Sequence, residues 1–262
     1  MAVIGVLSSL LLPSLARSKS QAQGIYCQNN TRQLILGCLM YCDDNGGFFP
    51  YNLAGTNAGT NINWAGGLLD WEPDSGNTNT SLLTEAALGP YLAQSSAVFH
   101  CPADTALSAI QRTLGWQNRV RSYSMNSSVG NVGVITEKGY NIYNPGLVQF
   151  FKLASIPAAA QIFVFTEEHP DTIYDGYFIN MATSNEWHRL PASYHGGSAN
   201  ISFADGHVEL HHWQDASTKP PPEPDTAEVF ASLPPGQQDD FNWVIAHMSV
   251  VQQPQQYPQQ AW

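Results

Sequence analysis

Two clusters of carboxylates and imidazoles hold the side chains of this chain that are best suited to chemistry. The first, EEHPD over residues 167–171, is followed by Asp175 and comes at the end of a stretch that predicts a buried strand. The second begins at His195 and continues through Asp205 to three further histidines. Carboxylates combined with one or two imidazoles suit calcium or zinc. If the strand end meets the second cluster, the candidate metal ligands are His169, Asp171, Asp175, His195 and Asp205.

A purely structural role for these residues is the alternative, and it is the one we favour. Asp175 and Asp205 each precede a glycine, as residues of tight turns often do. His207 and His211 alternate toward a strand face that we expect to be exposed. The spacing of the cluster matches neither the calcium loop of an EF-hand nor the HExxH zinc motif.

Sequence motifs of the common enzyme classes are absent. The chain has no GxSxG elbow, no Walker loop and no GxGxxG fingerprint followed by an acidic residue. His195 and Asp205 could be joined to a serine on paper, but no serine is marked by an elbow. Glu168 and Asp171 could form the carboxylate pair of a glycosidase, although nothing in the sequence fixes their separation. We therefore expect a protein that is not an enzyme.

The composition is acidic and poor in charge. The formal net charge is −11 with only ten Lys and Arg, which argues against nucleic acid or anionic lipid as a partner. Charged residues make up 12% of the chain, so Asn, Gln, Ser, Thr and Gly must supply the polar surface. Together with 17 Pro and 21 Gly, this composition favours short strands and many turns. We interpret the chain as a β-rich protein held outside the cytoplasm.

The four cysteines form no CxxC pair. Cys38 and Cys42 lie four residues apart in a helical pattern, and we expect both to be small core residues. Cys27 and Cys101 could form a disulfide in an oxidising compartment, but the sequence leaves that pairing open.

A long helix is predicted at the N-terminus. Residues 2–12 are almost entirely apolar and as a helix would span about 16 Å, roughly half of a bilayer core. Pro13 should bend this helix. From residue 14 to residue 44 the pattern is that of an amphipathic helix, which Asn45-Gly46-Gly47 then stops. The residues that define the amphipathic spacing are Ile25, Leu34, Cys38, Tyr41 and Cys42.

Shorter elements are predicted after residue 47. Residues 81–88 read as a short helix with Ser81 as its N-cap. Residues 161–166 form the clearest buried strand, and residues 98–101 and 177–179 are further strand candidates.

The C-terminal part differs in composition. Residues 219–224 (KPPPEP) predict a stiff, extended linker. Residues 241–251 could form a last helix or strand that docks on the body, and the Gln/Pro repeat over 252–260 is typical of a disordered tail.

A β-hairpin is the best-defined local prediction. Asp-Gly at 205–206 separates two alternating runs, ANISFA and HVELHHW, which is the signature of a two-residue type I′ turn. In that register the large apolar side chains of both strands share one buried face. The predicted pairs are Ala204–His207, Phe203–Val208, Ser202–Glu209 and Ile201–Leu210.

Several segments, in order, resemble prepilin-type, pseudopilin-like proteins that carry an H-X9-DG segment. His195 stands nine residues before Asp205-Gly206, as in that segment. AVIGVLSSLLLPSLARSKSQAQ resembles the second half of the type IV pilin signal helix, and CQNNTRQLILGCLMYCDDNGGFFP resembles the family's next block. Further similar segments are LGPYL, VFHCPAD, RSYSMN and IFVFTEEHPDTIYDG. The likeness covers about Ala2 to Trp213.

This resemblance implies an α+β, type IV pilin-like fold. In such a fold a long N-terminal helix packs on an antiparallel β-sheet with large loop insertions. The expected organisation is a hydrophobic and amphipathic helix over 1–47, a β-rich head with the H-X9-DG hairpin over 48–213, and a partly disordered Pro/Gln-rich extension over 214–262.

The resemblance also implies a structural role, as a pseudopilin or minor pilin of a type II secretion or type IV pilus-like system. The implied partners are other pilin or pseudopilin subunits, contacted through the N-terminal helix, the inner membrane, and a prepilin peptidase that cleaves and methylates the full-length precursor. The family's Phe-Thr-Leu-Ile-Glu cleavage site does not precede Ala2, so we expect a precursor that extends further upstream. The implied location is the inner membrane with the head in the periplasm, or an extracellular filament.

An alternative function of a different class is a membrane-anchored extracellular module that binds glycans. Aromatic side chains stack on sugar rings, and this chain is rich in tryptophan. The candidate stacking residues are Trp64, Trp71, Trp116 and Trp187.

Overall fold

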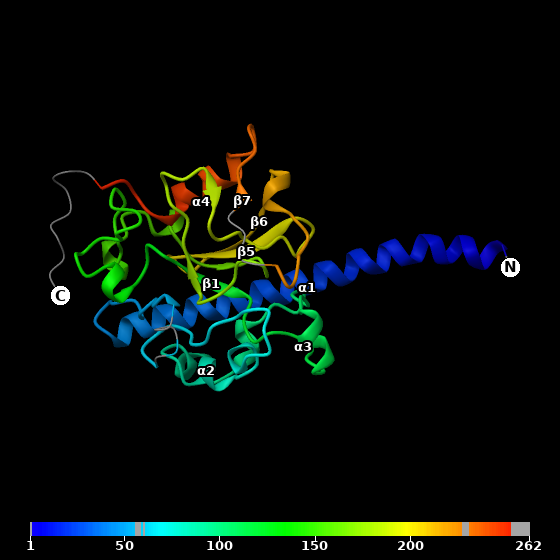
Figure 1. Ribbon diagram of the computed structural model, residues 1–262, viewed down its shortest axis with the longest axis horizontal. Coiled ribbons are helices and arrows are strands. Elements are labelled where there is room, and N and C mark those ends of the chain that lie inside the picture. Colours follow the sequence, from blue (N-terminus) through cyan, green and yellow to red (C-terminus); the bar gives the residue numbers. More distant parts are fainter. Residues whose placement is uncertain (1, 56–58, 60, 227–230, 253–262) are drawn as a thin grey trace.

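The molecule consists of a long N-terminal helix and a head that wraps around the second half of that helix (Figure 1). The computed structural model describes residues 2–55, 59, 61–226 and 231–252, with side chains from residue 18 onward except at residue 231. Helix α1 (Ala2–Asp44) is 43 residues long and continues through Pro13, while the predicted bend there remains a prediction. Its first part projects away from the head. The predicted disordered tail lies outside the described residues, except for its first residue.

Helix α1 ends where the glycines predict. The N–H of Gly47 donates to the carbonyl of Cys42 at 2.8 Å, and both Gly46 and Gly47 adopt positive φ, which closes the helix without steric cost. The α1 side chains that enter the core are Cys27, Leu34, Ile35, Cys38 and Cys42. The assignment of Ile25 to this face was wrong. It lies nine residues before Leu34, which is half a turn out of phase, and it is 68% exposed.

The head contains a five-stranded sheet with the strand order β3-β1-β2-β5-β6 among the described residues. Most neighbouring strands are antiparallel, but β3 runs parallel to β1, so the sheet is mixed and not antiparallel as expected. A second, two-stranded sheet pairs β4 with β7. The strands are β1 (Tyr123–Asn126), β2 (Phe163–Glu167), β3 (Tyr177–Phe178), β4 (Glu186–Trp187), β5 (Ser198–Phe203), β6 (Val208–His212) and β7 (Ala231–Ser232).

Both faces of the five-stranded sheet are covered. One face packs on α1, and α4 (Asp239–Met248) covers the other through Phe241, Val244 and Met248. The predicted strand over 161–166 is confirmed as β2, with its bounds shifted by one or two residues, and the strand candidate over 177–179 is confirmed as β3. The docked C-terminal element is confirmed as the helix α4. Because α1 and α4 lie on opposite faces, β5 is buried along its whole length.

Two of the shorter predictions were wrong. Helix α2 (Ser81–Thr84) is only one turn long with Thr80 at its N-cap, because the N–H of Ala87 donates to the carbonyl of Asn63 and leaves the helical path. Residues 96–99 form a 3-10 helix instead of a strand. The carbonyls of Ala97 and His100 accept from the side-chain amide of Asn30 on α1, which anchors this turn to the long helix.

The remaining helical segments are short. They are η2 (Ser75–Asn77), η3 (Gly89–Leu92), η4 (Ser96–Phe99), α3 (Ala109–Thr113), η5 (Gly133–Ile135), η6 (Leu153–Ser155), η7 (Ala159–Gln161) and η8 (Ala216–Thr218). Within the described part of the chain, no helix offers an apolar stretch long enough to cross a membrane.

The predicted hairpin is present, but its register differs by one residue. The N–H of Phe203 donates to the carbonyl of His207 at 3.0 Å, so the turn holds three residues. Within it only Gly206 has positive φ, whereas a type I′ turn needs positive φ at both central positions. Leu210 therefore pairs with Asn200 and is 48% exposed beside α1, and it does not share the buried face of Phe203.

Candidate functional site

His169 and Asp171 lie together, but they hold the C-terminal segment in place. The Nε2 of His169 is 3.1 Å from the carbonyl oxygen of Pro220, and its Nδ1 accepts from the N–H of Asp171 at 3.3 Å. The Asp171 carboxylate accepts from the N–H of Glu223 at 2.9 and 3.1 Å. Burial lowers the pKa of His169. Residues 219–224 are thus fastened to the head and do not form a free linker.

Asp175 and Asp205 serve turns, as the structural interpretation expected. The Asp175 carboxylate accepts from the N–H groups of Gly55 and Tyr177 and lies 3.7 Å from Nη2 of Arg189. Asp205 lies at the exposed hairpin tip, where its carboxylate binds both the N–H and the imidazole of His207. Among the described residues, neither aspartate belongs to a group of three or more histidine, cysteine or carboxylate side chains whose ligand atoms converge.

The five candidate metal ligands do not converge. A Cβ built on Gly24 would lie 3.6 Å from the imidazole of His195, and one built on Gly206 would lie 3.2 Å from Leu39. Gly24 and Leu39 are fifteen residues apart on α1, or about 22 Å at 1.5 Å per residue. His195 and the Asp205–Gly206 turn therefore contact opposite ends of the buried half of α1.

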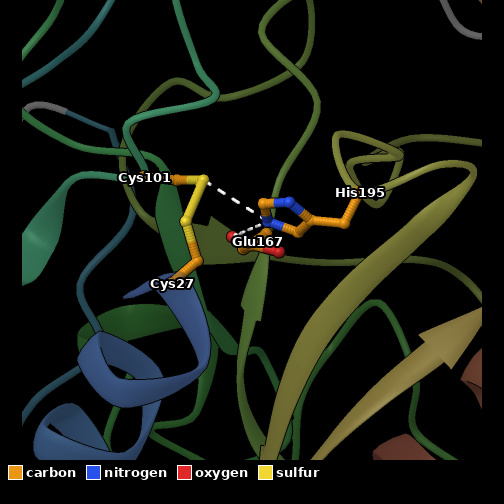
Figure 2. Close-up of side chains that lie close together, drawn as sticks. All are labelled: Cys27, Cys101, Glu167 and His195. Atoms are coloured by element: carbon orange, nitrogen blue, oxygen red, sulfur yellow. Dashed lines mark hydrogen bonds and ion pairs between the residues drawn. A yellow bond between two sulfur atoms is a disulfide. The ribbon is translucent and has the colours of Figure 1, made fainter. Parts of the chain in front are cut away.

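His195 instead meets a carboxylate and two cysteines that the sequence prediction did not group with it. Its Nε2 lies 3.1 Å from Oε1 of Glu167 and 3.5 Å from Sγ of Cys101. Cys101 forms a disulfide with Cys27 of α1, across a Cα–Cα distance of 5.3 Å. Figure 2 shows one nitrogen of the imidazole directed toward both the Cys101 sulfur and the carboxylate of Glu167. The disulfide that the sequence left open is present.

Four separate segments position this cluster. Cys27 comes from α1, Glu167 from the end of β2, Cys101 from the chain after η4, and His195 from the chain before β5. All four residues are buried, with at most 8% of any exposed. The four residues bring their possible metal-binding atoms together: the two sulfurs, a nitrogen of the imidazole and a carboxylate oxygen all lie within 4.8 Å of one another.

The Glu167 carboxylate is held by β5. Its Oε2 accepts from the backbone N–H of Asn200 at 2.7 Å and from the side-chain amide of Asn200 at 3.3 Å. The same amide lies 3.5 Å from the carbonyl of Gly24 on α1. These bonds fix the carboxylate between the strand and the helix, with Oε1 directed at His195.

Glu168 points into a different buried group, which contains Arg121 and Arg189. Its Oε1 accepts from the hydroxyl of Thr172 at 3.0 Å and lies 3.9 Å from Nε of Arg189. Burial raises the pKa of Glu168 to about 7, although the charge of Arg189 opposes that rise. Glu168 is 1% exposed, whereas the carboxylate of Asp171 binds the backbone N–H of Glu223.

Two of the four tryptophans proposed for glycan stacking are in the core. Trp64 and Trp187 are 0% and 1% exposed, and Trp64 packs against Phe165 with ring centroids 5.0 Å apart. Trp71 is half-buried, and the guanidinium of Arg119 covers its ring at 4.2 Å. The four rings therefore do not form an open stacking surface.

No protein-family model, no curated protein and no solved structure matches the chain.

Proposed function

We propose that this chain is a structural subunit, a pseudopilin or minor pilin of a type II secretion or type IV pilus-like system. It would assemble through α1 with α1 of neighbouring subunits. The observation that carries the proposal is the arrangement of α1, whose first part projects from the head. Its second half exposes a stripe in which the apolar residues Ile25, Leu36 and Met40 are interspersed with the polar residues Asn29 and Arg32.

The stripe lies on the side of α1 that the head leaves open. Ile25, Leu36 and Met40 are 68%, 46% and 56% exposed. At 100° per residue, Leu36 and Met40 lie about 20° and 60° around the helix axis from Ile25, so all three side chains face the same way. Large apolar side chains grouped on one side of a helix favour packing against another helix.

The disulfide between Cys27 and Cys101 supports a location outside the reducing cytoplasm. It joins α1 to the head at the point where the helix enters it. This covalent link suits a subunit in which a force on the helix must be transmitted to the head. The proposed location is the inner membrane with the head in the periplasm, or a filament outside the cell.

The double variant L36E/M40E tests the proposal. Two carboxylates on the stripe would have to be buried without partners at a helix–helix contact, so we expect full-length protein to lose ordered self-assembly. Assembly is measured by sedimentation and by electron microscopy of negatively stained protein. The head should keep its fold, because both positions are about half exposed.

I110E/L114E is the matched control. It places the same charges on apolar side chains of the head, in and at the end of α3, that are 44% and 54% exposed. Assembly by this control together with its loss in L36E/M40E supports the proposal. If L36E/M40E assembles as well as the wild type, or if the wild type stays monomeric and binds polysaccharide, the proposal is wrong.

A further inference from the structure

The geometry points to a zinc site that replaces the Cys27–Cys101 disulfide when that bond is reduced, with Cys27, Cys101, Glu167 and His195 as its ligands. Two thiolates, an imidazole and a carboxylate form a donor set that zinc accepts. This site differs from the cation site expected from the sequence, with which it shares only His195. It is also independent of the proposed function.

The distances from Nε2 of His195 to the Cys101 sulfur and to the Glu167 carboxylate already fit a tetrahedral zinc site. With Zn–S of about 2.3 Å and Zn–N and Zn–O of about 2.0 Å, a tetrahedron places sulfur about 3.5 Å from nitrogen and nitrogen about 3.3 Å from oxygen. The corresponding distances here are 3.5 Å from Cys101 Sγ to His195 Nε2 and 3.1 Å from that nitrogen to Glu167 Oε1. The two sulfurs must separate to about 3.8 Å in such a tetrahedron. The four ligand atoms already lie within 4.8 Å of one another.

The chemistry that opens the site requires a dithiol as reductant. The dithiol gives two electrons and two protons to the Cys27–Cys101 bond, which becomes two thiols, while the dithiol closes into its own disulfide. Zinc then displaces the two thiol protons, because only the thiolate is a ligand. His195 binds through the lone pair of Nε2 and carries its ring proton on Nδ1. In the oxidised chain the sulfurs are bonded to each other, so the two states exclude one another.

The surroundings support a zinc site in two further ways. The bonds from Asn200 to Oε2 of Glu167 leave Oε1 free of backbone donors and aimed at the site, as a supporting shell around a metal ligand does. A hollow of about 340 Å³ beside His195 is lined by polar side chains of α1, among them Ser20, Gln21 and Gln28. This hollow also borders Asn200 and gives an ion space beside the imidazole.

The test compares zinc binding by the full chain in its two redox states. The protein is reduced with dithiothreitol under anaerobic conditions, desalted, and mixed with zinc chloride, and bound metal is measured by mass spectrometry. We expect one zinc ion per reduced chain and none on the oxidised chain. Cobalt(II) in place of zinc should give the intense visible absorption of a tetrahedral site and a thiolate-to-cobalt charge-transfer band.

Single-ligand variants decide between this site and binding by any exposed thiols. E167Q and H195Q keep both cysteines, so their fold is first checked in the oxidised state. In the reduced state we expect zinc affinity to fall by more than about 10-fold, which is the loss that follows removal of even a supporting partner of a zinc ligand. C38A/C42A removes the chain's other two cysteines, which are buried and unpaired, and should bind zinc as the wild type does.

Two results would overturn the inference. One is reduced wild-type protein that holds no zinc. The other is H195Q and E167Q binding zinc as tightly as the wild type, because ligation by thiols alone does not depend on the imidazole or the carboxylate.

Discussion

Replacing the disulfide in C27A/C101A should lower the free energy of unfolding by about 4.5 kcal/mol. The two cysteines are 74 residues apart, and the chain-entropy relation for a loop of that length gives this value at 25 °C. The bond ties α1 to the segment that follows η4. Without it the residues between Cys27 and Cys101 no longer form a closed loop in the unfolded chain, so the unfolded state gains conformational entropy. Urea denaturation at neutral pH measures the loss.

C38A/C42A is the matched control for this prediction. It also removes two buried sulfurs from the core around α1, but it breaks no cross-link, so its loss of stability reports the cost of the vacated volume alone. We expect a smaller loss in the control. Equal losses in the two variants would contradict the chain-entropy argument. Reduced wild-type protein should recover part of its stability when zinc is added, since a ligand that binds only the folded state stabilises it.

The sequence predicted the long helix and the hairpin because both depend on local signals. Apolar spacing and the Asn-Gly-Gly stop define α1, and Asp-Gly marks the hairpin turn. The pairing register of the hairpin strands could not be predicted from these signals. A three-residue turn closed by Gly206 moved every pair by one position, and that slip exchanges the two faces of a strand. In the same way, Ile25 fits a spacing of three and four over short distances but drifts half a turn from Leu34.

The cluster around His195 could be predicted only in part. His195 and the pair Cys27–Cys101 were each noted, but nothing local relates positions that are 74 and 94 residues apart. The choice between Glu167 and Glu168 was also open, because adjacent residues of a strand face opposite sides. An irregularity in the β2–β5 register between Phe163 and Phe165 further obscures the alternation along β2. The signal in the sequence is that the apolar run ends in two consecutive carboxylates, and both of them are buried in the structure.

The buried guanidinium of Arg121 leads to the second large prediction, that R121M destabilises the protein by about 3–5 kcal/mol. Such losses follow when one partner of a buried charge group is removed. Arg121 is 0% exposed and donates to the carbonyls of Tyr123, Gly67 and Tyr174 at 3.0 to 3.3 Å. Burial lowers its pKa to about 10, while the nearby carboxylates of Glu168 and Asp175 act in the opposite direction.

Methionine has nearly the volume of arginine but none of its donors. In R121M three carbonyls lose a donor, and two buried carboxylates lose a compensating charge, without a large cavity being formed. R121K should lie between R121M and the wild type, because a single ammonium cannot donate in the directions of a planar guanidinium. R112M, at an exposed arginine in the last turn of α3, should change stability by less than about 0.5 kcal/mol. Urea denaturation ranks the four proteins. If R121M is as stable as the wild type, packing at this position outweighs the charge and hydrogen bonds of Arg121.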